Sequence, residues 1–194
     1  MYDKRPYQPI DQTPSRFLVD NLKLVDISDK PILDVACGYG RNGGYLAKNN
    51  HRVVFIDKDI ECLRYIKNGG KLSEQGHVDT RNVYALYKNL DEGKLSFPND
   101  STGGVIDIHY YNPLLIDELI RVLDKGGFFC FESISARGKN VYELPDYHFI
   151  KDKLKNFKII SYVERKVNPE ELGKSVMKVF AIKQYSWLIL LILV

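Results

Sequence analysis

The sequence predicts an α/β protein built around a largely parallel sheet, and three observations lead to this prediction. Short runs rich in β-branched and aromatic residues alternate with helix-like segments along the chain, as in strand-helix-strand units. A loop with two glycines, Gly38 and Gly40, separates the first such run from the helix that follows it. With 194 residues, of which 44% are apolar, the chain is long enough for one domain with a sizeable buried core.

The first half of the chain begins with a helix pattern and then alternates strands and helices. A helix is predicted over 15–25, because its apolar residues share one face and Ser15 is a suitable N-cap. Pro31–Ala36 is predicted to be a short strand of the buried type. The same criteria predict a helix over 41–49, a strand over 52–56, and a helix over 60–68 that stops at Gly69-Gly70.

The second half continues the alternation. A helix over 113–123 has Pro113 in its first turn, and the stretch Asp124–Gly127 is expected to end it. The other predicted elements are a helix over 147–156 and strands over 83–87, 105–110, 128–134, 158–163 and 176–183.

The composition excludes several classes of function. The 28 basic and 25 acidic residues leave a net charge of +3, and no clustered basic face for nucleic acid is expected. The cysteines Cys37, Cys62 and Cys130 lack C-x-x-C spacing, and His51 and His77 lack ligand spacing, so neither a disulfide framework nor a metal site is expected. The polar N-terminus is unlike a signal peptide. We expect a soluble, cytoplasmic protein with no membrane span.

The chain ends in eight consecutive apolar residues, Trp187–Val194. A helical span needs about 20 such residues, so this tail is too short to cross a bilayer. A last strand, a packed tail, a weak membrane-surface contact and a reading-frame artefact all stay open for it. We therefore expect one domain over residues 1–185 and an apolar tail over 186–194, with the oligomeric state left open.

The segment Ile32–Gly43 carries the functional signal. A strand, a glycine turn and a helix in this order place backbone N–H groups and a helix N-terminus beside a ligand. Gly38 and Gly40 lack a Cβ, so the backbone can approach that ligand closely. Asp57 follows the second strand, where a carboxylate can accept hydrogen bonds from both hydroxyls of a ribose. The pattern predicts a nucleoside-containing cofactor.

Two classes of cofactor fit this pattern. Gly38, Gly40 and Gly43 satisfy G-x-G-x-x-G, which together with Asp57 fits a nicotinamide dinucleotide. Asp34 argues against it, because a dinucleotide-binding strand is usually apolar there and a bare carboxylate is costly to bury. An acidic residue at this offset is found in S-adenosylmethionine-dependent methyltransferases, although it could simply cap the loop backbone.

The run LDVACGYGRNGGYLA, residues 33–47, resembles motif I of class I methyltransferases, in particular of the tellurite-resistance-type group. The likeness extends to the group's entry helix at 13–18, its second strand at 53–57, and its turn and fifth strand at 124–132. It covers residues 13–134 clearly. It implies a Rossmann-like doubly wound sheet of about seven strands, mostly parallel with the last strand antiparallel, and helices on both faces.

The resemblance also implies a cofactor and the residues that hold it. The cofactor is S-adenosylmethionine, with S-adenosylhomocysteine as the product. The residues implied at the methionine end are Asp34, Gly38 and Gly40, with loop backbone from Ala36 and Cys37. Those implied at the adenosine end are Asp57 on the ribose and Lys58, Asn89 and Leu90 beside the adenine.

Two positions depart from the family pattern. Asn89 stands where the family usually has an aspartate, and its side-chain oxygen can accept from the adenine amino group without charge assistance. Gly103-Gly104 replaces the usual aromatic-aspartate pair at the start of the fourth strand, so this strand is predicted to begin only at Val105.

The catalytic candidates follow the fourth strand, because the site of a parallel sheet lies at the carboxyl ends of its strands. His109 could act as a base near neutral pH or be an ordinary hydrogen-bonded histidine. Tyr110 and Tyr111 could wall the methyl site, and one of them is expected to pack instead. Further candidates are Glu132, to orient the acceptor or pair with Arg137, and Tyr142, Tyr147 and His148 as parts of a lid.

The preferred hypothesis is methyl transfer from S-adenosylmethionine to a small-molecule acceptor by in-line displacement. A non-catalytic S-adenosylmethionine-binding module is one alternative, favoured by the departures at Asn89 and Gly103-Gly104. A nicotinamide-dependent oxidoreductase is another, and it must account for Asp34. The sequence does not identify the acceptor, and a general base is needed only if the acceptor loses a proton.

Overall fold

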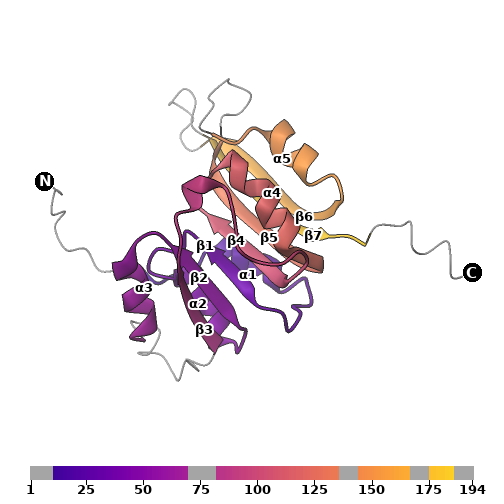
Figure 1. Ribbon diagram of the computed structural model, residues 1–194. Coiled ribbons are helices and arrows are strands. Elements are labelled where there is room, and N and C mark those ends of the chain that lie inside the picture. The colour runs from indigo at the N-terminus through magenta and orange to yellow at the C-terminus, as the bar shows by residue number, and fades with distance from the viewer. Residues whose placement is uncertain (1–10, 70–81, 136–143, 167–174, 186–194) are drawn as a thin grey trace, which may run out of the picture.

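The computed structural model describes residues 11–69, 82–135, 144–166 and 175–185, and its elements follow the predicted order (Figure 1). The apolar tail lies outside the described residues. The first six elements are α1 (Arg16–Leu22), β1 (Ile32–Val35), α2 (Arg41–Lys48), β2 (Val53–Asp57), α3 (Ile60–Lys67) and β3 (Val83–Tyr87). The others are the 3₁₀ turn η2 (Leu90–Glu92), β4 (Thr102–Ile108), α4 (Pro113–Val122), β5 (Leu123–Ser135), α5 (Tyr147–Lys153), β6 (Phe157–Lys166) and β7 (Ser175–Lys183).

The strands form one seven-stranded sheet in the order β3-β2-β1-β4-β5-β7-β6. β1 to β5 pair in parallel, whereas β7 lies between β5 and β6 and runs antiparallel to both. The predicted fold class is confirmed, including the antiparallel last strand. The reversal of strand order at β1 and β4 brings their carboxyl ends together, which is where open α/β sheets bind ligands.

Two apolar clusters cover the two faces of this sheet. Leu33, Val105 and Phe129 point to one face, where they pack against buried residues of α4 and α5. Ile32, Phe55 and Ile106 point to the other face, against α1, α2 and α3. Figure 1 shows α4 and α5 together on one side of the sheet. Because both faces of the sheet are covered, β1 and β4 at its centre are buried in every position, as parallel strands usually are.

The helix starts follow the predicted chemistry. Ser15 is the N-cap of α1, and its Oγ accepts from the Leu18 amide at 3.4 Å. Pro113 opens α4 after the cap Asn112, whose Oδ1 accepts from the Leu114 amide at 3.0 Å. Both predictions are confirmed. The helix ends were less well predicted, since α1 stops at Leu22 and α5 at Lys153.

The start of β4 was predicted wrongly. The strand begins at Thr102, three residues before the predicted start, and Gly103 and Gly104 are buried within it. A Cβ on Gly103 would collide with Ser28, and one on Gly104 would collide with the ring of Phe128. These glycines therefore mark a close approach of neighbouring chain segments, and the absence of side chains is what lets the strand continue.

The stretch Asp124–Gly127 was also assigned wrongly. It was expected to be the turn that ends a helix, yet α4 ends at Val122 and β5 begins at Leu123, which pairs with Thr102. A register shift separates this pair from the regular ladder that starts at Phe128. Lys30 Nζ lies 2.6 Å from the Asp124 carboxylate, and the Lys183 ammonium donates to Leu123 O at 2.5 Å. These contacts, made by residues that are distant in the sequence, hold residues 123–127 in the sheet.

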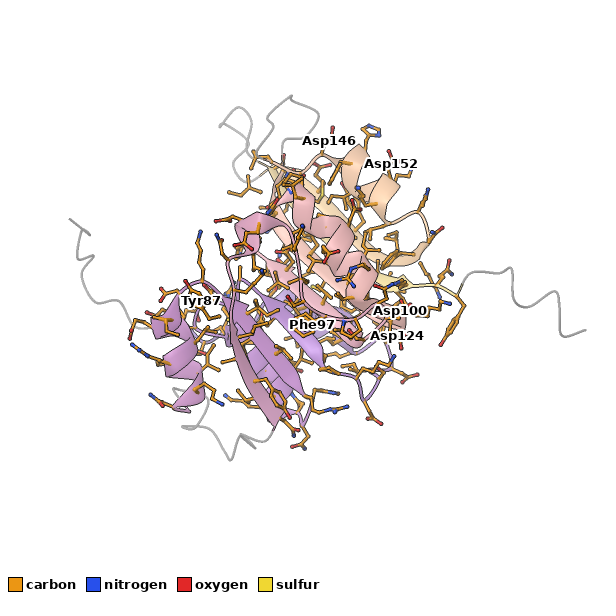
Figure 2. All side chains as sticks on the ribbon, viewed as in Figure 1. Tyr87, Phe97, Asp100, Asp124, Asp146 and Asp152 are labelled. Atoms are coloured by element: carbon orange, nitrogen blue, oxygen red, sulfur yellow. The ribbon has the colours of Figure 1, made fainter. Side chains whose placement is uncertain are left out.

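Figure 2 shows Asp100 and Asp124 close to each other and well apart from Asp146. Lys183 Nζ donates to Asp100 Oδ1 at 2.8 Å and to the carbonyl of Ile120 at 2.9 Å. Lysine contacts thus connect the segments around the amino ends of β4 and β5.

Replacing Gly104 with alanine should lower the free energy of unfolding by about 1–3 kcal/mol, because the added methyl group meets the Phe128 ring. Urea denaturation measures the loss. The double variant Gly104→Ala/Phe128→Leu removes the obstructing ring, so its loss should be smaller than the sum of the two single losses. Strictly additive losses would show that the glycine is needed for another reason.

Candidate functional site

Two adjoining cavities lie at the carboxyl ends of β1, β2 and β4. The larger has a volume of about 350 Å³, and the smaller about 70 Å³. Ala36, the first residue after β1, lines both of them. The larger cavity is lined by Asp11, Asp34, Ala36, Cys37, Gly38, Tyr39, Arg41, Asn42, Ile108 and His109, and the smaller by Ala36, Asp57, Lys58, Lys88, Leu90, Asp91 and Tyr110.

The loop between β1 and α2 has left-handed backbone at three positions. The φ angles are +49° at Ala36, +52° at Gly38 and +77° at Gly40. Nothing lies within 4 Å of a Cβ built on Gly38, so this residue borders open space. The left-handed conformation is easy for glycine but costs about 1–3 kcal/mol at an alanine, which marks Ala36 as a strained position in a cavity wall.

Asp34 fixes this loop to the helix that follows it. Its Oδ2 accepts from the Gly43 amide at 2.8 Å, and its side chain is almost fully buried. A Cβ on Gly43 would come 2.7 Å from that same oxygen, so only glycine lets the amide approach. Burial raises the pKa of Asp34 to about 7, against the opposing effect of the Gly43 hydrogen bond.

Asp57, at the end of β2, is bonded to the same loop from the other side. One of its oxygens accepts from the Gly38 amide at 2.8 Å and the other from the Asp59 amide at 2.9 Å. The two carboxylates predicted from the sequence thus hold the two ends of the glycine loop. They also line different cavities, Asp34 the larger and Asp57 the smaller.

A hydrogen-bonded chain bridges three loops beside the smaller cavity. The Lys58 ammonium lies 2.8 Å from Asp91 Oδ2, and the Tyr110 hydroxyl donates to Asp91 Oδ1 at 3.1 Å. The hydrogen bond from Lys58 holds the pKa of Asp91 below its usual range, while burial raises the pKa of Tyr110 to about 12. The Tyr110 hydroxyl therefore stays protonated at neutral pH.

Asn89 lies outside the lining of both cavities. Its Oδ1 accepts from the Asp91 amide at 3.2 Å and caps η2. Its neighbour Leu90 is buried and lines the smaller cavity, as do Lys88 and Asp91. The segment from which the adenine contacts were predicted therefore borders this cavity through Leu90, and also through Lys88 and Asp91, which were not among the predicted contacts.

The residues after β4 divide between the two cavities. His109 is exposed, lines the larger cavity and has a left-handed φ of +67°. Its amide donates to the Glu132 carbonyl at 2.8 Å. Tyr110 lines the smaller cavity, whereas Tyr111 packs edge-to-face on Phe131 and Phe149.

The other sequence candidates have the following places. Glu132 is buried and paired with Lys178, whereas Arg137 lies outside the described residues. Tyr142 and the side chain of Tyr147 also lie outside them, and His148 is exposed in the first turn of α5. Burial raises the pKa of the Cys37 thiol, so this cysteine supplies no thiolate to the larger cavity. In the described part of the chain, no three potential ligands are grouped for a metal ion.

Two curated proteins are similar to this chain in sequence. A fatty-acid O-methyltransferase of Mycolicibacterium smegmatis is 22% identical over 161 residues, which are 75% of this chain and 54% of the relative. A phthiotriol/phenolphthiotriol dimycocerosates methyltransferase of Mycobacterium leprae is 30% identical over 121 residues, 59% of this chain and 42% of the relative. The chain thus spans about half the length of these relatives. No family model matches it.

Solved structures with the same architecture are more numerous, and three are representative. TehB from Haemophilus influenzae has a TM-score of 0.68 at 14% identity, covering 87% of this chain and 62% of TehB. An S-adenosylmethionine-dependent methyltransferase from Methanosarcina mazei has a TM-score of 0.63 at 16% identity, covering 86% and 98%. Geranyl diphosphate C-methyltransferase from Streptomyces coelicolor, crystallised with S-adenosylhomocysteine, has a TM-score of 0.66 at 12% identity, covering 86% and 77%. The chain has the class I methyltransferase fold.

One buried acid within this methyltransferase fold was missed by the sequence analysis. Asp107 is the last residue but one of β4, is fully buried, and has no hydrogen-bond partner for either carboxylate oxygen within the described residues. Burial, reinforced by the charge of Asp34, raises its pKa well above the usual range. The sequence does contain an indication of this buried acid, because Asp107 is the single acid in the apolar run VIDI, residues 105–108.

No helix in the described ranges of this methyltransferase fold is long and apolar enough to cross a membrane.

The raised pKa of Asp34 predicts a specific dependence of stability on pH. Between pH 4 and 7 the folded protein keeps a proton on Asp34 that the unfolded chain, with a pKa of 3.8, has released. The contribution of Asp34 to the free energy of unfolding therefore falls as the pH rises through this range, by a few kcal/mol at about 1.4 kcal/mol per pKa unit.

The variant Asp34→Asn keeps an acceptor for the Gly43 amide but does not titrate. Its stability relative to the wild type should rise between pH 4 and 8, as measured by urea denaturation at several pH values. A difference that stays constant with pH would show that Asp34 is ionised throughout.

Proposed function

We propose that this chain is an S-adenosylmethionine-dependent methyltransferase that transfers a methyl group to a small-molecule acceptor. The observation that carries the proposal is the pair of cavities that meet at Ala36, each with one carboxylate bonded to the glycine loop between them. Asp34 would serve the methionine half of the cofactor and Asp57 the ribose. The methyltransferase fold and the methyltransferase relatives support this assignment.

The residues present fit such a cofactor. The larger cavity offers open space at Gly38 and an acid, Asp34, for a cationic amino-acid end. The smaller cavity is bordered by Leu90 and Tyr110, whose apolar surfaces suit a planar base. In this proposal Gly40 shapes the loop, Cys37 contributes backbone, and Asn89 acts by capping η2.

When bound, S-adenosylmethionine supplies an electrophilic methyl group on a sulfonium. The tasks of the chain are to orient the acceptor and to exclude water. His109 is our candidate for a general base, since it is exposed to the larger cavity. Tyr110 would act as a hydrogen-bond donor, because its pKa of about 12 prevents it from accepting a proton as a phenolate at neutral pH.

For the acceptor we propose a small molecule and no nucleic acid. The two curated relatives have names that state small-molecule acceptors, a fatty acid and a phthiotriol dimycocerosate. The near balance of 28 basic and 25 acidic residues gives no support to a nucleic-acid substrate. We propose further that residues 1–185 form the methyltransferase domain and that it works in the cytoplasm, where the free cysteines Cys37, Cys62 and Cys130 stay reduced.

Calorimetric titration with S-adenosylmethionine, S-adenosylhomocysteine and NAD tests the cofactor. The first two should bind saturably, and NAD should not. Asp57→Ala should weaken binding of S-adenosylhomocysteine about tenfold or more, because a partly buried hydrogen-bonding carboxylate is lost from the smaller cavity. Asp26→Ala, which removes an exposed carboxylate ahead of β1, is the matched control and should bind as the wild type does. Binding of NAD alone would replace this proposal with the oxidoreductase.

Binding should also release a proton. A cationic ligand in the cavity lined by Asp34 favours the ionised carboxylate, so affinity for S-adenosylmethionine should rise as the pH increases from 5.5 to 7.5. Titration in two buffers of different ionisation enthalpy counts the proton. Asp34→Asn should release none, and an unchanged proton count in this variant would place the titrating group elsewhere.

A further inference from the structure

The segment Asp11–Ser15, here termed the N-terminal strap, lies against the glycine loop and forms part of the larger cavity. Asp11 lines that cavity. The Arg41 guanidinium lies 3.8 Å from the Asp11 carboxylate and donates to the Thr13 carbonyl at 3.3 Å. Gln12 Nε2 donates to the carbonyl of Tyr39 at 3.4 Å. These contacts are long and exposed, so by themselves they hold the strap weakly.

The strap is anchored more firmly at its last residue. Ser15 is buried, and its amide donates to Asn42 Oδ1 at 2.9 Å. Asn42 is itself buried and lines the larger cavity. The Ser15 hydroxyl donates to Glu132 Oε1. A hydroxyl bonded to a buried carboxylate is a charge-assisted hydrogen bond, the stronger kind.

Glu132 is a buried carboxylate that lines neither cavity but bonds to two parts of the site, the strap and His109. Only 2% of the residue is exposed, and its second oxygen lies 2.5 Å from the Lys178 ammonium on β7. Its side chain holds the strap through Ser15, while its backbone carbonyl accepts from the amide of His109. The strap and His109 are thus both attached to one residue of β5.

The ion pair explains why a charge can stay at this buried position. Lys178 lies directly opposite Glu132 in the β5–β7 ladder, and its ammonium lies 5.5 Å from the centre of the Phe17 ring in α1. The pair neutralises Glu132 and places α1 over the sheet. The remaining carboxylate oxygen is then available for Ser15.

We propose that Glu132 is a positioning residue: it holds the N-terminal strap, and with it Asn42, in the wall of the larger cavity, and so determines how firmly the methionine half of the cofactor is bound. This inference rests on the proposed function, in which the larger cavity takes the methionine half and the smaller cavity the adenosine. A merely structural Glu132 would affect both halves alike.

Two ligands separate these cases. S-adenosylhomocysteine extends into both cavities under the proposed function, whereas adenosine has no methionine half. Ser15→Ala removes the hydroxyl that Glu132 holds and leaves the Glu132–Lys178 pair in place. This variant should bind S-adenosylhomocysteine about tenfold more weakly, through faster dissociation, with adenosine affinity within about twofold of the wild type. Calorimetry, competition and stopped-flow dissociation give these values. Glu132→Gln should show the same selective loss.

Three control variants separate the loss of the Ser15 hydroxyl from other effects on binding. Ser15→Thr restores a hydroxyl and an N-cap, so its affinity for S-adenosylhomocysteine should return to within about twofold of the wild type. Asp146→Ala removes the N-cap of α5 and matches Ser15→Ala in lost helix capping, yet it should leave both affinities unchanged. Asp57→Ala should weaken both ligands, because Asp57 lines the adenosine side.

The outcomes are distinct. Equal weakening of both ligands by Ser15→Ala, or no weakening of either, would overturn the positioning role of Glu132 while the proposed function stood. If the wild type bound neither ligand, the proposed function would be wrong, and this inference would fall with it.

Discussion

The hydrogen bond from the Gly43 amide to the Asp34 carboxylate joins the end of β1 to the first turn of α2, and the shape of the site depends on it. The bond requires glycine at position 43, because a side chain there would occupy the space of the carboxylate oxygen. With this bond made, the intervening loop must turn back on itself, and it does so through left-handed backbone at Ala36, Gly38 and Gly40. A buried acid therefore acts as the fixed point from which the loop projects into open space.

The second carboxylate, Asp57, holds the same loop from β2, so the loop lies between two acids in different surroundings. Asp34 is buried and keeps its proton up to about pH 7. The loop therefore separates a larger cavity, whose charge can respond to a cation, from a smaller cavity bordered by Leu90 and Tyr110. This division matches a ligand with a charged end and an aromatic end, and the methyltransferase proposal follows from it.

The amino and carboxyl ends of the parallel strands carry different kinds of side chain. At the amino end, Lys30 and Lys183 join Asp124, Asp100 and the end of α4 by short ionic contacts. At the carboxyl end lie the buried acids Asp34 and Asp107 and the left-handed backbone of His109, and the buried Glu132 pairs there with the partly buried Lys178. A stable amino end allows the carboxyl end to keep groups that would otherwise lower stability.

The sequence by itself determined the fold class, the order of the elements and the glycine loop with its two acids, because these depend on local patterns: apolar runs, caps such as Ser15, and the spacing of Asp34, Gly38 and Asp57. It misplaced the start of β4 and the turn at 124–127, and it did not single out Asp107, Asp91 or the place of Glu132 beside Ser15. Only the tertiary structure decided these features. The glycines of β4 make sense only beside Ser28 and Phe128, and Glu132 meets a serine 117 residues away in the chain. A local pattern records the conformation that a residue favours, whereas burial, collision and charge pairing depend on which distant segments the sheet brings together.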